Sequence, residues 1–183
     1  MTMTGKMILW GCLALGGLSL LLFTTTTLAA TGGKLDTTTV TSLDLDRYKG
    51  VWYEIARKPH FFEKGMTRVK TTYTPIGEGK IEVRNEGIKN GKTKVTKGTA
   101  RTTDVPGRLK VTFFLFPAQY NVLEIGPDYS YAVVGGSNDS YLWILSRTPT
   151  MDSATLESIF ERLRERGYNL SDLIMVEQQT VAL

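Results

Sequence analysis

The side chains that most often carry out chemistry in proteins are scarce in this sequence. Its 183 residues include one histidine, His60, and one cysteine, Cys12. A Ser-His-Asp triad or a haem ligand would have to use His60, and nothing in the sequence marks a serine partner for it. The sequence therefore predicts a binding protein rather than an enzyme, with no catalytic residue, no cofactor and no metal site.

A carboxylate among apolar residues is the unusual feature of the stretch GVWYEIAR, residues 50–57. Side chains alternate between the two faces of a strand. This alternation places Trp52, Glu54 and Ala56 on one face and Tyr53 and Ile55 on the other. Because both faces carry large apolar groups, we expect the first to line the interior and the second to lie beneath a helix. Glu54 should then meet buried polar partners, since an unpaired buried carboxylate is costly.

Short β-like runs separated by turn residues make up the chain from residue 51 to residue 147. Asn90-Gly91, between two alternating runs, is a strong hairpin signal. The nearly regular spacing predicts an antiparallel sandwich or barrel. The eight expected strands are 51–58, 67–76, 80–88, 93–103, 108–116, 120–125, 129–134 and 140–147.

The hydrophobic period changes after residue 147, where an amphipathic helix of three to four turns is expected. Its apolar stripe consists of Leu156, Ile159, Phe160 and Leu163. Thr150 or Asp152 can cap its start, and Gly167 lies where a C-terminal cap is expected. Residues 173–179 then predict one last short strand.

Polar and small side chains interrupt the apolar face of the predicted strands. Tyr73 and Asn85 share that face with Val83, Val111 and Phe113. A packed sandwich core favours uniform aliphatic residues, whereas a mixed apolar wall suits a ligand cavity. An eight-stranded barrel is just wide enough to hold one small ligand. We therefore predict an all-β fold, an eight-stranded antiparallel barrel with one C-terminal helix packed on the outside.

The first 30 residues have the pattern of a secretory signal peptide, with a basic start and an uncharged apolar run over Met7–Phe23. An uncleaved membrane anchor is the alternative, because these 17 residues are near the minimum that spans a bilayer. A polar spacer at 31–43 and one domain at 44–180 would follow. Cys12 begins the apolar run instead of ending it, which does not fit the lipid anchor of a bacterial lipoprotein.

The formal net charge of +4 is small, and the lysines and arginines are scattered along the chain. This distribution gives no support for nucleic-acid binding. The positive net charge would still allow a weak attraction to anionic membrane surfaces.

Three stretches together resemble the signatures of the lipocalin family. LDRYKGVWYEIAR, residues 45–57, resembles the G-x-W strand that opens the lipocalin barrel. GPDYSYAVV, residues 126–134, resembles the second signature, with Pro127 in place of a threonine. LWILSRTP, residues 142–149, resembles the third. The order and spacing agree over about 135 residues, and the similarity is greatest to bacterial cell-envelope lipocalins and next to animal apolipoprotein D.

The resemblance implies an up-and-down barrel that carries small hydrophobic ligands, and the bacterial branch implies fatty acids or lysophospholipids. It also implies that Arg147 lies across the Trp52 ring near the closed end, beside Gly50, in a structural role. Secretion across the inner membrane, to the periplasm or the outer membrane, would follow from the same branch. A structural or stress-protective envelope protein is the alternative, and a lipocalin-fold enzyme is a weaker one.

The residues expected to bind the ligand combine the inward-facing positions with those that match pocket positions of relatives. They are Ala56, Tyr73, Val83, Asn85, Val111, Phe113, Tyr120 and Trp143. Plain core filling is the alternative role for each aromatic among them. In the expected mouth loop, 58–66, Phe61 and Phe62 could cover an acyl chain, and Lys58 and Lys64 could meet an acidic head. Phe114 and Phe116 would permit a homodimer.

Overall fold

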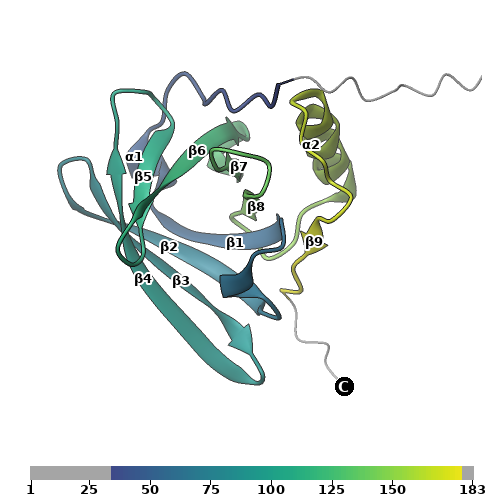
Figure 1. The fold of residues 1–183 in the computed structure, drawn as a ribbon, viewed down its shortest axis with the longest axis horizontal. Coiled ribbons are helices and arrows are strands. Elements are labelled where there is room, and N and C mark those ends of the chain that lie inside the picture. The colour runs from purple at the N-terminus through teal and green to yellow at the C-terminus, as the bar shows by residue number, and fades with distance from the viewer. Residues whose placement is uncertain (1–33, 179–183) are drawn as a thin grey trace, which may run out of the picture. The chain divides into compact units, whose positions relative to one another are not determined.

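A single antiparallel β-sheet closes on itself in the computed structural model, which describes residues 34–178 (Figure 1). The expected signal peptide and Cys12 lie outside these residues. The strand order is β2-β3-β4-β5-β6-β7-β8-β1-β9, and an additional β1–β2 pairing completes an eight-stranded barrel. The strands are β1 (Gly50–Arg57), β2 (Thr67–Gly77), β3 (Lys80–Lys89), β4 (Lys92–Thr102), β5 (Arg108–Thr112), β6 (Pro117–Ile125), β7 (Tyr131–Gly135), β8 (Leu142–Ser146) and β9 (Ile174–Met175). The predicted fold class is confirmed.

Local turn chemistry explains why consecutive strands pair. Asn90 and Gly91 both have positive φ, +52° and +70°, as the tight turn between β3 and β4 requires. Because every connection in the barrel is a hairpin, the loops alternate between its two ends. The loops after β1, β3, β5 and β7 therefore surround one opening, the mouth, and the others lie at the opposite end.

A β-bulge in β1 changes which of its side chains face inward. The register between β1 and β8 shifts between Glu54 and Ala56, because Ile55 is an extra residue. Ala56 consequently lies with Ile55 in the cluster outside the barrel, and Arg57 returns to the inner side, where it contacts Glu54. The prediction that Ala56 faces inward is wrong, because strict alternation holds only for a strand without a bulge.

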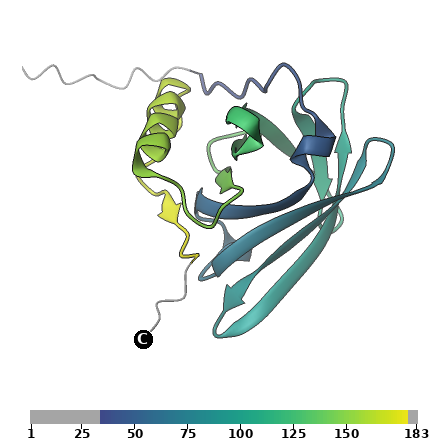
Figure 2. The same ribbon diagram turned by 180° about the vertical axis from the view of Figure 1, so that it is seen from behind.

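Helix α2 (Ser153–Glu165) lies along the outside of the barrel (Figures 1 and 2). Asp152 caps its start by accepting a 2.8 Å hydrogen bond from the Thr155 amide, and Gly167 follows its end with φ +86°. Ile159 and Leu163 are fully buried against β1, β6, β7 and β8. The barrel residues of this cluster are Ile55, Ala56, Leu123, Val133, Leu142 and Ile144.

Three other expectations about elements need correction. The expected strand 108–116 ends at Thr112, and Phe114, Leu115 and Phe116 form a loop in which each side chain is more than 80% exposed. The last strand is only β9, which pairs with the end of β1. Tyr53 is half-buried and is not part of the cluster beneath α2. Within residues 34–178, no helix is long and apolar enough to cross a membrane.

The end opposite the mouth is closed by α1 (Leu45–Tyr48), a short helix that the sequence did not reveal. The Arg147 guanidinium lies 3.7 Å from the centroid of the fully buried Trp52 ring. Arg147 also donates to the Val51 carbonyl at 2.9 Å, and Trp52 Nε1 donates to the Tyr48 carbonyl at 2.8 Å. The geometry is that of a structural cation–π contact.

Gly50 has φ +93° and lies against Arg147, where an added Cβ would be 3.5 Å from the guanidinium. An L side chain rarely adopts that backbone conformation, so glycine lets the chain pass from α1 into β1 at this point.

Candidate functional site

A cavity of about 440 Å³ occupies the barrel between the mouth and the aromatic layer above Trp52. Its size falls in the range of sites for small organic ligands. The wall is mainly aliphatic and aromatic, with a few polar groups. Its principal lining residues are Glu54, Phe61, Phe62, Glu63, Thr71, Tyr73, Val83, Asn85, Val111, Phe113, Tyr120, Tyr141, Trp143 and Leu145.

Seven of the eight residues predicted to bind ligand line this cavity. They are Tyr73, Val83, Asn85, Val111, Phe113, Tyr120 and Trp143, together with the mouth residues Phe61 and Phe62. Ala56 is the exception, because the bulge turns it beneath α2. Strand alternation found Tyr73, Val83, Asn85 and Val111, because the pairing of β2, β3 and β5 is regular at these residues. Tyr120 and Trp143 came from the resemblance to the family.

Three tyrosines form a hydrogen-bonded layer at the inner end of the cavity. The Tyr120 hydroxyl lies 2.6 Å from that of Tyr73 and 2.7 Å from that of Tyr48. The Tyr48 ring also contacts the Trp52 ring, with centroids 5.1 Å apart. Burial raises the pKa of each of the three phenols, so at neutral pH the layer is uncharged.

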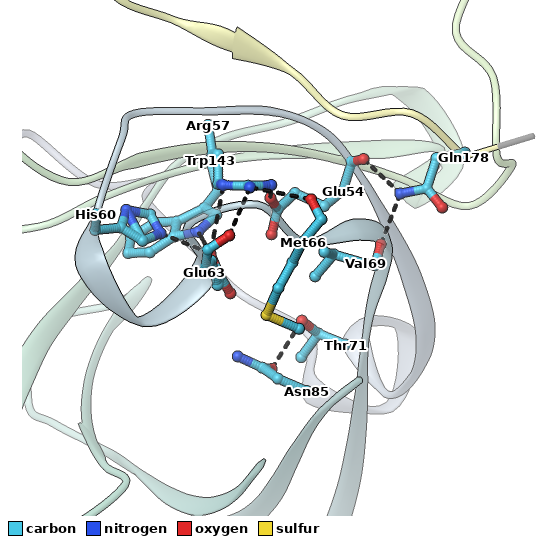
Figure 3. Close-up of polar contacts among 10 residues, drawn as sticks. All are labelled: Glu54, Arg57, His60, Glu63, Met66, Val69, Thr71, Asn85, Trp143 and Gln178. Carbon is cyan, nitrogen blue, oxygen red and sulfur yellow. Dashed lines mark hydrogen bonds and ion pairs between the residues drawn. The ribbon is translucent and has the colours of Figure 1, made fainter. Parts of the chain in front are cut away.

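An ionisable cluster lies in the cavity wall nearer the mouth, and Figure 3 shows its contacts. Arg57 donates to Glu54 Oε1 at 2.6 Å and to the Glu63 carbonyl at 2.9 Å. Its Nε lies 3.8 Å from Glu63 Oε2. Trp143 Nε1 donates to the same carboxylate oxygen at 3.3 Å. The exposed fractions of Glu54, Arg57 and Glu63 are 2%, 2% and 4%, so these charges are almost fully removed from water.

Two carboxylates share one guanidinium in this cluster, and their pKa values rise. For Glu54 the main cause is burial and the second is the charge of Glu63, which together outweigh Arg57 and raise its pKa to about 8. Burial also raises the pKa of Glu63, against the opposing effects of Trp143 and Arg57. A low-dielectric site does not favour two anions beside one cation, so the cluster holds an extra proton at neutral pH.

His60 completes the cluster from the mouth side. Its Nε2 lies 2.6 Å from Glu63 Oε2, and its ring stacks on Phe62 with centroids 4.3 Å apart. Burial first, and the charge of Arg57 second, lower the pKa of His60 to about 4. Glu63 is its only hydrogen-bond partner among the described residues, so His60 is neutral and does not lie against a serine.

Lys58 does not reach the cavity, contrary to the expectation that it meets an acidic head. Its ammonium lies 2.6 Å from Asp172 and 3.5 Å from Asp139, on the outer side of the barrel end. Lys64 is exposed on the mouth loop and does not line the cavity.

A family model for the lipocalin-like domain matches residues 43–178. The chain belongs to the lipocalin family. It is 41% identical over 146 residues to the outer membrane lipoprotein Blc of Vibrio cholerae, an alignment covering 76% of this chain and 85% of that one. Mouse apolipoprotein D is 31% identical over 150 residues, with 75% and 78% covered. The predicted resemblance to bacterial envelope lipocalins and apolipoprotein D is confirmed.

The fold of this lipocalin is also found in a solved structure, that of the cockroach allergen Per a 4. The two structures superpose with a TM-score of 0.64 at 26% sequence identity, covering 80% of this chain and 94% of the allergen. Lipocalins bind small hydrophobic ligands, and the cavity of this chain has the apolar wall that such ligands need.

Sequence reasoning missed three groups of the site. Glu63 was not recognised, because it lies in a short helix of the mouth loop (Phe61–Glu63), where no strand period applies. Tyr48 precedes the first strand and belongs to α1. Strict alternation places Arg57 on the outer face with Tyr53 and Ile55, and only the bulge turns it inward. The sequence signal for the Glu54–Arg57 ion pair is the opposite charge of these two residues, which are close in the chain.

Proposed function

We propose that this lipocalin binds and carries single-chain lipids, fatty acids or lysophospholipids, inside its barrel. The observation that supports this proposal most directly is the 440 Å³ cavity, which has an aliphatic and aromatic wall. Each methylene that leaves water contributes roughly 0.8 kcal/mol, and ordering the ligand offsets part of that gain. An acyl chain lying along Val83, Val111 and Leu145 would therefore be held mainly by its own burial.

The site of action we propose is the cell envelope, after secretion across the inner membrane. Its support is the similarity to Blc, which is named an outer membrane lipoprotein in Vibrio cholerae, together with the signal-peptide pattern of residues 1–30. Phe61, Phe114, Leu115 and Phe116 expose more than 80% of their side chains around the mouth. Exposed apolar groups of this kind suit contact with a lipid surface during loading.

The first experiment is native mass spectrometry of the protein purified from its envelope, followed by organic extraction. We expect a retained fatty acid or lysophospholipid. Val83→Trp fills the cavity and should abolish retention, as should the Tyr73→Ala, Trp143→Ala double variant. Val51→Trp is the matched control, since Val51 is 39% exposed on the outside.

Two results would contradict this proposal. One is a folded wild-type protein that retains no lipid and binds none from an added panel of acyl lipids. The other is equal lipid retention in Val83→Trp and the wild type. Either result would favour a structural role exerted through protein contacts.

A further inference from the structure

The charged side chains that reach the surface of the cavity are acidic. Among the described residues, Glu54 and Glu63 are the only charged side chains that line it, and no lysine or arginine does. We propose that Glu54 and Glu63 make the cavity select lipids whose polar end carries an ammonium group over lipids that end in a carboxylate. This inference rests on the proposed function and narrows its ligand class.

Arg57 is poorly placed to pair with a ligand carboxylate, because it does not line the cavity and both of its terminal nitrogens already donate to the protein. Nη1 donates to Glu54, and Nη2 donates to the carbonyls of Glu63 and Met66 at 2.9 and 3.2 Å. Its Nε faces Glu63. Figure 3 shows the guanidinium enclosed by these acceptors. A fatty acid head that reached Arg57 would compete with Glu54 and Glu63 for the one cation that they share.

The acid pair keeps acceptor capacity that an ammonium can use. Glu54 Oε1 accepts from Arg57, and Glu63 Oε2 faces Arg57, His60 and Trp143. The second oxygens, Glu54 Oε2 and Glu63 Oε1, accept no hydrogen bond from any described residue. An ammonium has three donors and no acceptor, and on binding it would displace the extra proton of the acid pair, which leaves two anions beside two cations. A carboxylate would bring a third acid beside one guanidinium and would have to bind a proton to enter.

Aromatic rings frame the acid pair on the mouth side. Trp143 lies against Glu63 through its indole N–H, and its ring stacks with that of Tyr141 with centroids 6.1 Å apart. Phe62, Tyr141 and Trp143 all line the cavity. The faces of aromatic rings attract ammonium groups, and they do so more strongly when water is excluded. Among the described residues, the cavity lining contains no cationic side chain that could attract an anion in the same way.

Two kinds of molecule carry this chemistry, namely a lysophospholipid with an ethanolamine headgroup and a free long-chain amine. In either molecule, the alkyl chain would lie along the apolar wall of the cavity while the ammonium contacts the acid pair. The experiment therefore includes both sources, matched in chain length to anionic and neutral probes.

The test is titration calorimetry of the full-length protein at neutral pH with five probes of one chain length. They are dodecylamine, dodecanol, dodecanoate, lauroyl lysophosphatidylethanolamine and lauroyl lysophosphatidylglycerol. We expect each ammonium probe to bind about tenfold more tightly than its anionic counterpart. Tighter binding of the amine than of the ethanolamine lipid would identify a free amine as the source, and the reverse would identify the headgroup.

Glu63→Gln removes one carboxylate and leaves the closer Glu54–Arg57 pair intact, so the preference for ammonium should collapse. Glu82→Gln is the matched control, because Glu82 lies on β3 and pairs with Lys97 outside the barrel; it should keep the preference. If Glu63→Gln does not fold, Glu54→Gln prevents the other acid of the pair from ionising when an ammonium binds, and it leaves Arg57 facing Glu63.

Equal affinity for all probes, or tighter binding of dodecanoate, would overturn the inference while the proposed lipid carrier stands. Failure of every probe to bind would overturn both. Retention of the ammonium preference in the glutamine variants would show that the acid pair does not cause it.

Discussion

Glu54 and His60 titrate in opposite senses in the folded protein, and each links its stability to pH. The pKa of Glu54 is raised to about 8, so between its ordinary value and about 8 the folded protein binds a proton that the unfolded chain has lost. The pKa of His60 is lowered from 6.5 to about 4, so over that range the unfolded chain binds the extra proton. The groups that face Glu54 and His60 are Arg57, Glu63, Trp143 and Tyr73.

These linkages predict an asymmetric stability profile. From about pH 4.5 to 6.5 the His60 contribution opposes that of the acid pair, so the free energy of unfolding should change less steeply than it does above pH 6.5. Above 6.5 the His60 contribution is complete and the raised pKa values of the acid pair act unopposed, so up to about pH 8 the free energy of unfolding should fall, with about 1.4 kcal/mol per pH unit from Glu54. Urea denaturation across this range measures the profile.

Glu54→Gln is the control for that profile, because glutamine imitates the protonated acid and leaves Arg57 one carboxylate, Glu63. In this variant the free energy of unfolding should rise up to about pH 6.5 with the His60 contribution and then stay level. An equal fall above that pH in both proteins would show that Glu54 does not carry the proton.

The bulge in β1 determines how one strand serves two surfaces. Before the bulge, Trp52 and Glu54 face the interior, and after it Arg57 does, while Ile55 and Ala56 lie together beneath α2. Two adjacent outward residues widen the apolar surface on which the helix packs. The same irregularity places Arg57 within reach of both carboxylates of the cluster, so the bulge shapes the site and the helix contact together.

Ala56→Leu tests this assignment of faces. Added methyl groups beneath α2 should overpack the cluster and lower the free energy of unfolding by about 1–3 kcal/mol, while ligand affinity stays unchanged. Val83→Leu is the comparison, since Val83 lines the cavity and should change affinity with little loss of stability. Loss of affinity without loss of stability in Ala56→Leu would place Ala56 inside the barrel. Urea denaturation measures the free energy of unfolding, and lipid titration measures the ligand affinity.

The two ends of the whole barrel differ in chemistry. One end is closed by α1, the Trp52–Arg147 contact and the tyrosine layer. The other is open and carries the most exposed aromatic side chains, Phe61, Phe114 and Phe116. A ligand can therefore enter only at the apolar end, which is the end suited to a lipid surface.

Replacing Phe114, Leu115 and Phe116 by serine should leave the melting temperature unchanged, because these side chains pack against little of the protein. Association with phospholipid vesicles, measured by co-sedimentation, should largely disappear. The matched control replaces three exposed residues away from the mouth, Val51, Ile76 and Val105, and should bind vesicles normally. Conversion of a dimer to a monomer by the mouth variant, without change in vesicle binding, would identify this loop as an interface between copies.

The sequence by itself determined the strands, the hairpins, the helix stripe and most of the cavity wall. Alternation and turn chemistry are local, so the strand period alone places Val83, Asn85 and Val111 on the inner face. Tertiary structure alone decided the rest. The bulge at Ile55 depends on the pairing of β1 with β8, and the acid pair depends on a loop folding back onto the wall. Burial of Glu54 and Glu63 beside one arginine, which sets their protonation, is a property of the closed barrel rather than of any segment.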